Sequence, residues 1–173
     1  MGQRLCHRKG SVVVSLILGL GSNLGERENN LKKAIKSIAQ ELDIIAVGVA
    51  IETKPVDYLS QPHFLNQSLE CQLPTSTPEE LLNSIKKIEL NLGRQISFAK
   101  GPRVIDIDIL FWGDLHYQSP TLSIPHPQVI NRHFIFQTVK ELPFFKEKIT
   151  SHAEFSHYFQ SIIHSQLNNS TTF

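Results

Sequence analysis

Residues Gly101 to Trp112 read GPRVIDIDILFW, an apolar and largely β-branched run that contains two aspartates. A run of this kind, preceded by Gly-Pro and followed by Gly-Asp, predicts a β-strand that ends in a turn. Side chains alternate between the two faces of a strand, so Asp106 and Asp108 are expected to share one face, about 7 Å apart. The opposite face is expected to belong to the core and carries Ile105, Ile107, Ile109 and Phe111.

Two interpretations fit this acidic face. One is the solvated outer face of a sheet, where water offsets the repulsion between the two charges. The other is a metal–phosphate site, because Mg2+ takes oxygen ligands from one or two carboxylates and fills its other positions with water and nucleotide phosphates. The strand alone leaves both open.

Length and composition predict a single domain without a strong overall field. The 173 residues, 40% of them hydrophobic, suffice for one well-cored domain, expected over about 11–167. A net charge of +1 gives no mark of a nucleic-acid or membrane binder, so neither partner is expected. The two cysteines, Cys6 and Cys71, lie outside any CxxC pattern, so no zinc site or disulfide framework is expected, and a reducing cytoplasm is the default.

The first 21 residues resemble a secretory signal, because basic residues precede the apolar run VVVSLILGLG. That run is too short to span a membrane, and no A-x-A-like cleavage site follows it. We therefore expect a short basic tail and then a first core strand over 11–20.

The remaining pattern predicts alternating elements. Amphipathic helices are expected over 26–42 and 77–93, the second of them opened by a capping box. Strands are expected over 44–51 and 64–73, with a long loop over 52–62 between them. Together with the first strand and the acidic strand, these elements give the order βαββαβ. This order favours a ferredoxin-like α+β sandwich with an antiparallel sheet, one face covered by helices and the other free to bind a ligand.

C-terminal additions are expected after the acidic strand. They comprise a short hairpin, a proline-bounded turn, a last amphipathic helix around 155–163 and a frayed tail from residue 168.

Three further segments carry polar groups suited to a phosphate site, although each also has a simpler explanation. LGLGSNLG, residues 18–25, offers a glycine turn, which helix capping alone would explain. Arg94, Lys100 and Arg103 flank the loop before the acidic strand and suit phosphate oxygens, although they could equally neutralise the aspartates. His126 and Arg132 lie in the turn IPHPQVINRHF.

Taken together, these segments resemble the 6-hydroxymethyl-7,8-dihydropterin pyrophosphokinase family of folate biosynthesis. The resemblance covers about 18–142 and follows the family's order: LGLGSNLG, ETKPVDYLSQPHFLN, EELL with IELNLGR, GPRVIDIDILFWG and IPHPQVINRHF. It implies a ferredoxin-like fold, two Mg2+ ions, and transfer of the β,γ-diphosphate of ATP to the hydroxymethyl group of the pterin with release of AMP. Fusion of this chain to another folate-pathway enzyme is left open.

The resemblance also implies roles for residues by position. The metal ligands would be Asp106 and Asp108. The catalytic residues would be Arg94, Arg103, Asp106, Asp108 and His126. ATP would contact Lys86, Glu89, Arg94, Lys100, Arg103, Ile109, His126 and Arg132. The pterin pocket, in which aromatic rings would stack on the flat heterocycle, would contain Gly21, Asn23, Thr53, Lys54, Val56, Phe64, Asn66 and Phe134.

This chain departs from the family at several positions. The loop 95–100, QISFAK, is one residue short and has only Lys100 as a basic residue, where the family usually has several arginines. Lys86 replaces a common Gln, Phe64 a common Tyr, and Lys54 a common Pro. None of these changes removes an implied metal ligand.

Other classes of protein share parts of the pattern. A polymerase-β-type nucleotidyltransferase also combines a Gly-Ser turn with a D-x-D strand around Mg2+, but there the motifs lie close together, whereas here most of the domain separates Gly21 from Asp106. An RNA-binding module of the same fold would carry stacked aromatic residues where this chain carries acids. A family member that has lost activity is a third alternative, which a turnover assay would resolve.

Overall fold

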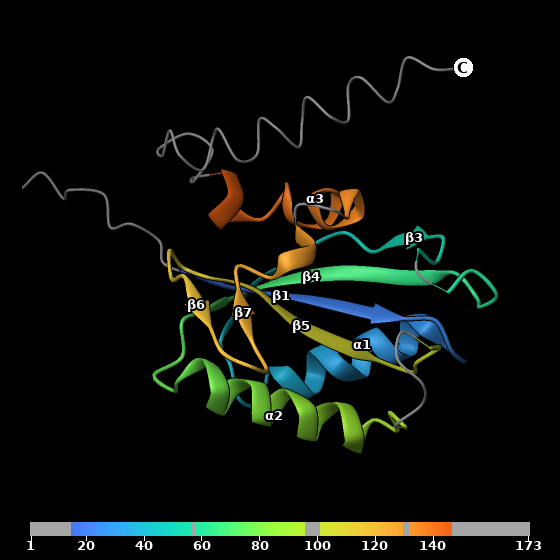
Figure 1. Cartoon of the computed structure of the whole chain (residues 1–173), viewed down its shortest axis with the longest axis horizontal. Coiled ribbons are helices and arrows are strands. Elements are labelled where there is room, and N and C mark those ends of the chain that lie inside the picture. The colour runs from blue at the N-terminus through green and yellow to red at the C-terminus, as the bar shows by residue number, and fades with distance from the viewer. Residues whose placement is uncertain (1–14, 57, 96–100, 130–131, 147–173) are drawn as a thin grey trace, which may run out of the picture.

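Figure 1 shows a computed structural model of the chain, which describes residues 15–56, 58–95, 101–129 and 132–146. The expected basic tail, the last amphipathic helix around 155–163, the frayed tail and Lys100 lie outside these ranges. Within them, the fold is a mixed α/β arrangement built on an antiparallel sheet. No helix in the described ranges has the length and apolar run that a membrane crossing requires.

The sheet has five strands, with β1 (Ser15–Ser22) in the middle. Its neighbours are β4 (Phe64–Gln72) and β5 (Asp106–Trp112), and both pairs are antiparallel. β2 (Ile44–Val47) and β3 (Ile51–Thr53) both pair with β4, on its far side from β1. The prediction of one continuous strand over 44–51 is therefore wrong, because the strand is interrupted at residues 48–50.

One face of the sheet is covered by two helices, as expected. α1 (Arg27–Ile38) and α2 (Pro78–Asn91) lie side by side beneath it in Figure 1. The predicted capping box of α2 is confirmed, since Thr77 Oγ1 accepts from Glu80 N and Glu80 Oε2 accepts from Thr77 N. Helix and sheet side chains close a buried core on this face, including Leu16, Leu18, Leu31, Ala34, Ile85, Ile105, Ile107 and Ile109.

The opposite face is only partly free, which corrects the expectation of an uncovered binding face. α3 (His133–Val139) lies across it, as Figure 1 shows, and the turn that follows α3 adds a second apolar cluster. That cluster contains Ile17, Leu110, Phe111, Val139, Leu142, Phe144 and Phe145. The ligand site is therefore confined to the part of this face that α3 leaves open.

Phe111 belongs to this second cluster, so its predicted place beside Ile105, Ile107 and Ile109 is wrong. The cause is a β-bulge: Ile17 pairs with Phe111 and Leu18 pairs with Ile109, which leaves Leu110 as an extra residue in β5. A bulge shifts the alternation of side chains by one position.

The expected hairpin after the acidic strand is confirmed. β6 (Tyr117–Gln118) pairs with β7 (Ser123–Ile124), and a 3-10 turn, Pro127–Val129, leads on toward α3. This connection brings His126 back to β5, where its main-chain N donates to Leu110 O at 3.0 Å.

Candidate active site

A cavity of about 300 Å3 lies on the sheet face that carries the aspartates, beside α3. Its lining combines residues from β1, β4, β5, α2, α3 and the loop after β3. Fourteen residues predicted from the resemblance line it: Gly21, Thr53, Lys54, Val56, Phe64, Asn66, Lys86, Arg94, Arg103, Asp106, Asp108, His126, Arg132 and Phe134. The structure thus brings together groups that are up to 113 positions apart, as between Gly21 and Phe134.

Two ion pairs hold the first acidic side chain of β5. Arg94 lies 2.8 Å from Asp106 Oδ1, and Arg103 donates to Asp106 Oδ2 at 2.7 Å. The arginines therefore do neutralise this aspartate, as one of the two interpretations of the basic loop expected. Both arginines also line the cavity with it.

The second acidic side chain, Asp108, is in a different electrostatic environment. Burial and the neighbouring charge of Asp106 raise its pKa to about 7, an effect that Lys86 and Arg103 oppose. A carboxyl group with a raised pKa lacks compensation for its negative charge, and a bound cation would supply it.

The two aspartates fit a magnesium site by their chemistry. Mg2+ prefers oxygen ligands and commonly uses only one or two carboxylates, with water and phosphate completing its octahedron. Within the described ranges, no group of three or more His, Cys, Asp or Glu side chains is placed so that it could hold a metal ion by itself. The pair suits a cation that a phosphate-bearing substrate helps to hold.

Glu89 lies behind the part of the cavity that the two aspartates line, and it is not itself a lining residue. Its side chain is 1% exposed, and Oε1 accepts from the main-chain N of Ile107 at 2.7 Å and forms an ion pair with Arg94. Oε2 accepts from Lys86 Nζ at 3.0 Å. Glu89 therefore orients two cationic side chains toward the cavity while tying α2 to β5.

Ile109, the other residue expected near the nucleoside, has its side chain in the core between the sheet and the two helices. A contact with a ligand would therefore have to use its main chain.

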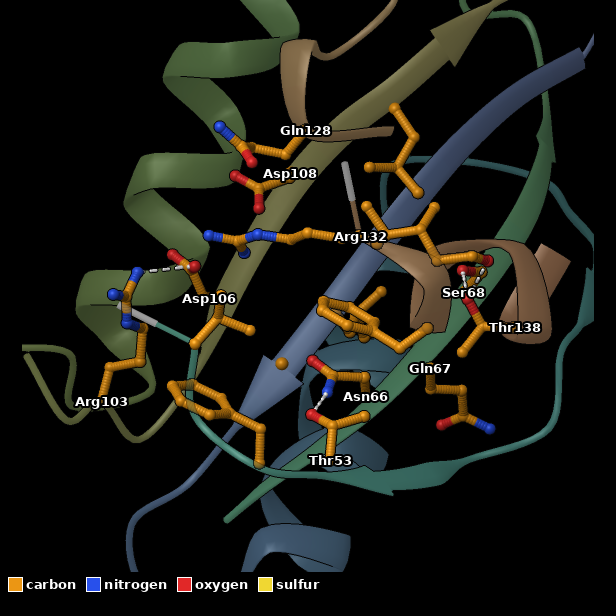
Figure 2. A pocket seen from close by; sticks show the side chains of 18 of the residues that line it. Thr53, Asn66, Gln67, Ser68, Arg103, Asp106, Asp108, Gln128, Arg132 and Thr138 are labelled. Carbon is orange, nitrogen blue, oxygen red and sulfur yellow. Dashed lines mark hydrogen bonds and ion pairs between the residues drawn. The ribbon is translucent and has the colours of Figure 1, made fainter. Parts of the chain in front are cut away.

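His126 and Arg132 add basic groups opposite β5. The main-chain N of Gln128 donates to His126 Nδ1 at 3.2 Å, which places the proton of the neutral imidazole on Nε2. Burial and the neighbouring Arg132 lower the pKa of His126. Figure 2 shows Arg132 extending toward Asp106 and Asp108, and its guanidinium carbon is 5.9 Å from the centroid of the Phe134 ring.

Another part of the cavity combines aromatic and amide side chains. Asn66 is 7% exposed and donates from Nδ2 to Thr53 Oγ1 at 2.7 Å, as Figure 2 shows. Gly21 faces it across the β1–β4 pair, and a Cβ there would lie 3.0 Å from Asn66 Oδ1. Phe64 and Phe134 supply aromatic surface. A heterocycle could stack on these rings and form hydrogen bonds with the amide.

Asn23, also expected in this pocket, does not line the cavity but links two of its walls. It is 2% exposed, and its Oδ1 accepts from the main-chain N of Arg103 at 2.7 Å. Its Nδ2 donates to Gln61 Oε1 at 2.9 Å and to Pro62 O at 3.2 Å. Asn23 thus joins the loop after β3 to the segment that carries Arg103, two walls of the same cavity.

Several lining residues were not anticipated from the sequence. They include Gln61, Gln67, Ser68, Gln128, Ile135 and Thr138. Ser68 could have been found, because it follows Asn66 by two positions on a strand and so shares its face. Ile135 and Thr138 depend on how α3 docks, for which the sequence carries no local signal.

Comparison with known proteins gives the same assignment. Residues 17–143 match the family described as 7,8-dihydro-6-hydroxymethylpterin-pyrophosphokinase. A 2-amino-4-hydroxy-6-hydroxymethyldihydropteridine pyrophosphokinase from Aquifex aeolicus is 37% identical over 130 residues, which cover 75% of this chain and 81% of the relative.

Other relatives are larger fusion proteins. The mitochondrial folate synthesis bifunctional protein of Pisum sativum is 35% identical over 73% of this chain, which spans 25% of that protein. The bifunctional protein FolKE of Lactococcus lactis strain IL1403 is 38% identical over 72% of this chain, which spans 36% of it.

Solved structures agree at the level of the fold. The Plasmodium falciparum HPPK-DHPS crystal structure with SDX-DHP gives a TM-score of 0.57 at 18% identity, covering 75% of this chain and 40% of that one. Because the match to the family spans most of the chain and a relative is more than one-third identical, the chain belongs to the 7,8-dihydro-6-hydroxymethylpterin-pyrophosphokinase family and is a diphosphokinase-type transferase.

Proposed function

We propose that this chain transfers the β,γ-diphosphate of ATP to the hydroxymethyl group of 6-hydroxymethyl-7,8-dihydropterin and releases AMP, in a reaction that requires Mg2+. The observation that carries the proposal is the two-ended cavity. Acidic and basic groups meet at one end, Phe64 and Asn66 lie beside Gly21 at the other, and Phe134 lies beside Arg132. A substrate pair made of a polyphosphate and a flat heterocycle matches both ends.

At the phosphate end, Asp106 and Asp108 would hold two Mg2+ ions, which would neutralise charge on the phosphate oxygens. Arg103, Arg132 and His126 would bind the same oxygens, and His126 would donate from Nε2. Arg94 and Lys86, oriented by Glu89, would add positive charge on the side of α2. Such positioning and charge neutralisation are the main sources of acceleration in phosphoryl-type transfer.

At the pterin end, the rings of Phe64 and Phe134 would enclose the heterocycle while Asn66 and Thr53 bind its polar edge. This would direct the hydroxymethyl group toward the triphosphate. The hydroxyl oxygen would then bond to the β-phosphorus in line, the bond from that phosphorus to the α,β-bridging oxygen would break, and AMP would leave as the hydroxyl proton is lost. Holding both substrates in this geometry lowers the entropic cost of the reaction.

We also propose that the fold is ferredoxin-like. The sheet order β2-β4-β1-β5, all antiparallel, and the helix positions support a ferredoxin-like arrangement with α3 as the start of the C-terminal additions. We further propose that 11–167 form one catalytic domain. The fused relatives from Pisum sativum and Lactococcus lactis support the proposal that such a domain can work beside another folate-pathway enzyme.

The direct test is identification of the nucleotide product. Purified protein is incubated with ATP, the hydroxymethyl dihydropterin and Mg2+, and the products are separated by ion-exchange chromatography, with parallel reactions that lack the pterin or contain EDTA. AMP in amounts equal to the diphosphorylated pterin is expected, and only in the complete reaction. Formation of ADP, or turnover in EDTA, would overturn the proposal.

A further inference from the structure

Helix α3 carries Phe134 into the cavity, and besides the apolar contacts of Ile135 and Val139 its position depends on a few polar contacts. It has seven residues, and Arg132 at its N-cap makes no capping side-chain hydrogen bond within the part of the chain that the structure describes. A helix this short is marginal by itself and depends on tertiary contacts. What fixes α3 against the sheet therefore also fixes one wall of the cavity.

A buried hydrogen-bond chain links α3 to β4. Thr138 Oγ1 donates to Ile135 O at 2.8 Å, which uses its only proton. The hydroxyl of Ser68, 2.6 Å away, therefore donates to Thr138 Oγ1. Ser68 and Thr138 are 1% and 2% exposed, and Figure 2 shows them meeting at the side of the cavity where α3 crosses β4.

Gly48 sets how closely α3 approaches. A Cβ at this position would lie 2.3 Å from Thr138 O and 3.1 Å from Ser68 O, so a side chain would force α3 away. The main-chain N of Gly48 donates to Ser68 O at 2.8 Å, and Gln67 Nε2 donates to Gly48 O at 2.8 Å. The break between β2 and β3 is thus bound to the same point of β4 as α3.

The Ser68–Thr138 hydrogen bond lies on the same faces of β4 and α3 as two residues of the ligand site. Ser68 follows Asn66 by two positions on β4, roughly 7 Å along the same face. Thr138 follows Phe134 by four positions on α3, which is one turn, roughly 6 Å, on the same side of the helix. A strand and a single helix turn are rigid over such lengths. The distance between Ser68 and Thr138 therefore sets the distance between Asn66 and Phe134.

We propose that Ser68, Thr138 and Gly48 are positioning residues for the pterin, because they hold α3 at the distance from the sheet at which Phe134 lines the pocket with Asn66. The inference rests on the proposed function, since the pterin is the ligand whose binding it concerns.

The test is calorimetric titration with 6-hydroxymethyl-7,8-dihydropterin in the presence of Mg2+ and α,β-methylene-ATP. Ser68→Ala and Thr138→Val each remove the same hydrogen bond, so each is expected to weaken pterin binding roughly three- to tenfold. The double variant should bind the pterin no more weakly than either single variant, because each single substitution already removes the one hydrogen bond that the two residues share. Thr138→Ser keeps the hydroxyl and should bind nearly as the wild type does.

Ser15→Ala is the matched control. Ser15 is fully buried and donates from Oγ to Glu70 Oε1 at 2.8 Å, away from the cavity lining. The Ser15→Ala variant should be less stable than the wild type, as measured by urea unfolding, yet keep the wild-type affinity for the pterin. Gly48→Ala supplies an independent variant that acts by steric displacement and should weaken binding at least as much as Thr138→Val.

Three results would overturn the inference: unchanged pterin affinity in both Ser68→Ala and Thr138→Val, equal weakening in Ser15→Ala, or failure of Thr138→Ser to restore binding. A wild-type protein that does not bind the pterin at all would instead refute the proposed function, and the inference would fall with it.

Discussion

Glu89 offers a strong test of how the phosphate end of the cavity is organised. Its buried carboxylate accepts from Ile107 N, forms an ion pair with Arg94 and accepts from Lys86. Replacing it by Ala would leave the Ile107 N–H without its acceptor and the Arg94 guanidinium without one of its two carboxylate partners. Removing one member of a buried ionic group typically costs about 3 to 5 kcal/mol.

Glu89→Gln should cost less, because the amide keeps the size of the side chain and one acceptor oxygen. That oxygen is expected to stay on Ile107 N, and the NH2 group should turn toward Lys86, whose side chain is 47% exposed and can move into water. The remaining loss is the charge that held Arg94, about 1.5 to 3 kcal/mol as for a charge-assisted hydrogen bond. Both variants should bind Mg-ATP analogues more weakly, because Arg94 loses its orientation.

Urea unfolding followed by circular dichroism measures the stability, and calorimetry with α,β-methylene-ATP measures nucleotide binding. Glu52→Gln is the control, because Glu52 forms an exposed ion pair with Arg27 at 2.7 Å and such pairs contribute about 0.2 to 1 kcal/mol. A Glu89→Ala variant that is no less stable than Glu52→Gln, or that binds the nucleotide as tightly as the wild type, would show that Glu89 does not organise the phosphate end.

The other predictions concern the metal ligands, the aromatic wall and a buried thiol. Asp106→Ala and Asp108→Ala should each lower turnover by several orders of magnitude while pterin still binds, as steady-state kinetics and calorimetry would measure; near-normal turnover in either variant contradicts the assigned role. Phe64→Ala and Phe134→Ala should each weaken pterin binding by about 1 to 3 kcal/mol through lost burial and stacking, with Mg-ATP binding nearly intact; equal loss of both ligands would indicate misfolding. Burial raises the pKa of Cys71 to about 12, so iodoacetamide at neutral pH should label this thiol, in a Cys6→Ser background, only after unfolding; labelling of the folded protein would argue against its burial.

Features that depend on short stretches of sequence could be predicted. The spacing of Leu31, Ala34 and Ile38 places one apolar stripe on α1, and the capping box of Thr77 and Glu80 marks where α2 begins. The alternation in β5 correctly placed Asp106 and Asp108 on one face, because nothing disturbs the strand before Ile109. Each of these depends only on neighbours within one or two turns or strand positions.

Features that depend on contacts between distant segments could not be predicted. The bulge at Leu110 is visible only from the pairing of β5 with β1. The break at Gly48 and the docking of α3 depend on Ser68 and Thr138, which are 70 positions apart. The resemblance implied that Asn23 belongs to the loop beside the pterin pocket. The contacts by which its amide joins two segments could not be predicted, because they depend on Gln61 and Arg103.

Because of the bulge, β5 contributes side chains first to the ligand site and then to the apolar cluster under α3. Before it, the side toward α3 carries Asp106 and Asp108; after it, Leu110 and Phe111 both turn to that side and join the cluster under the α3 segment. Without the bulge, regular alternation of the same residues would return Phe111 to the helix layer and bring Trp112 beneath α3. Deletion of Leu110 would remove the extra residue and leave Phe111 and Trp112 on their present faces. The bulge is therefore what allows the seven residues of β5 to supply both the helix layer and the cluster under α3.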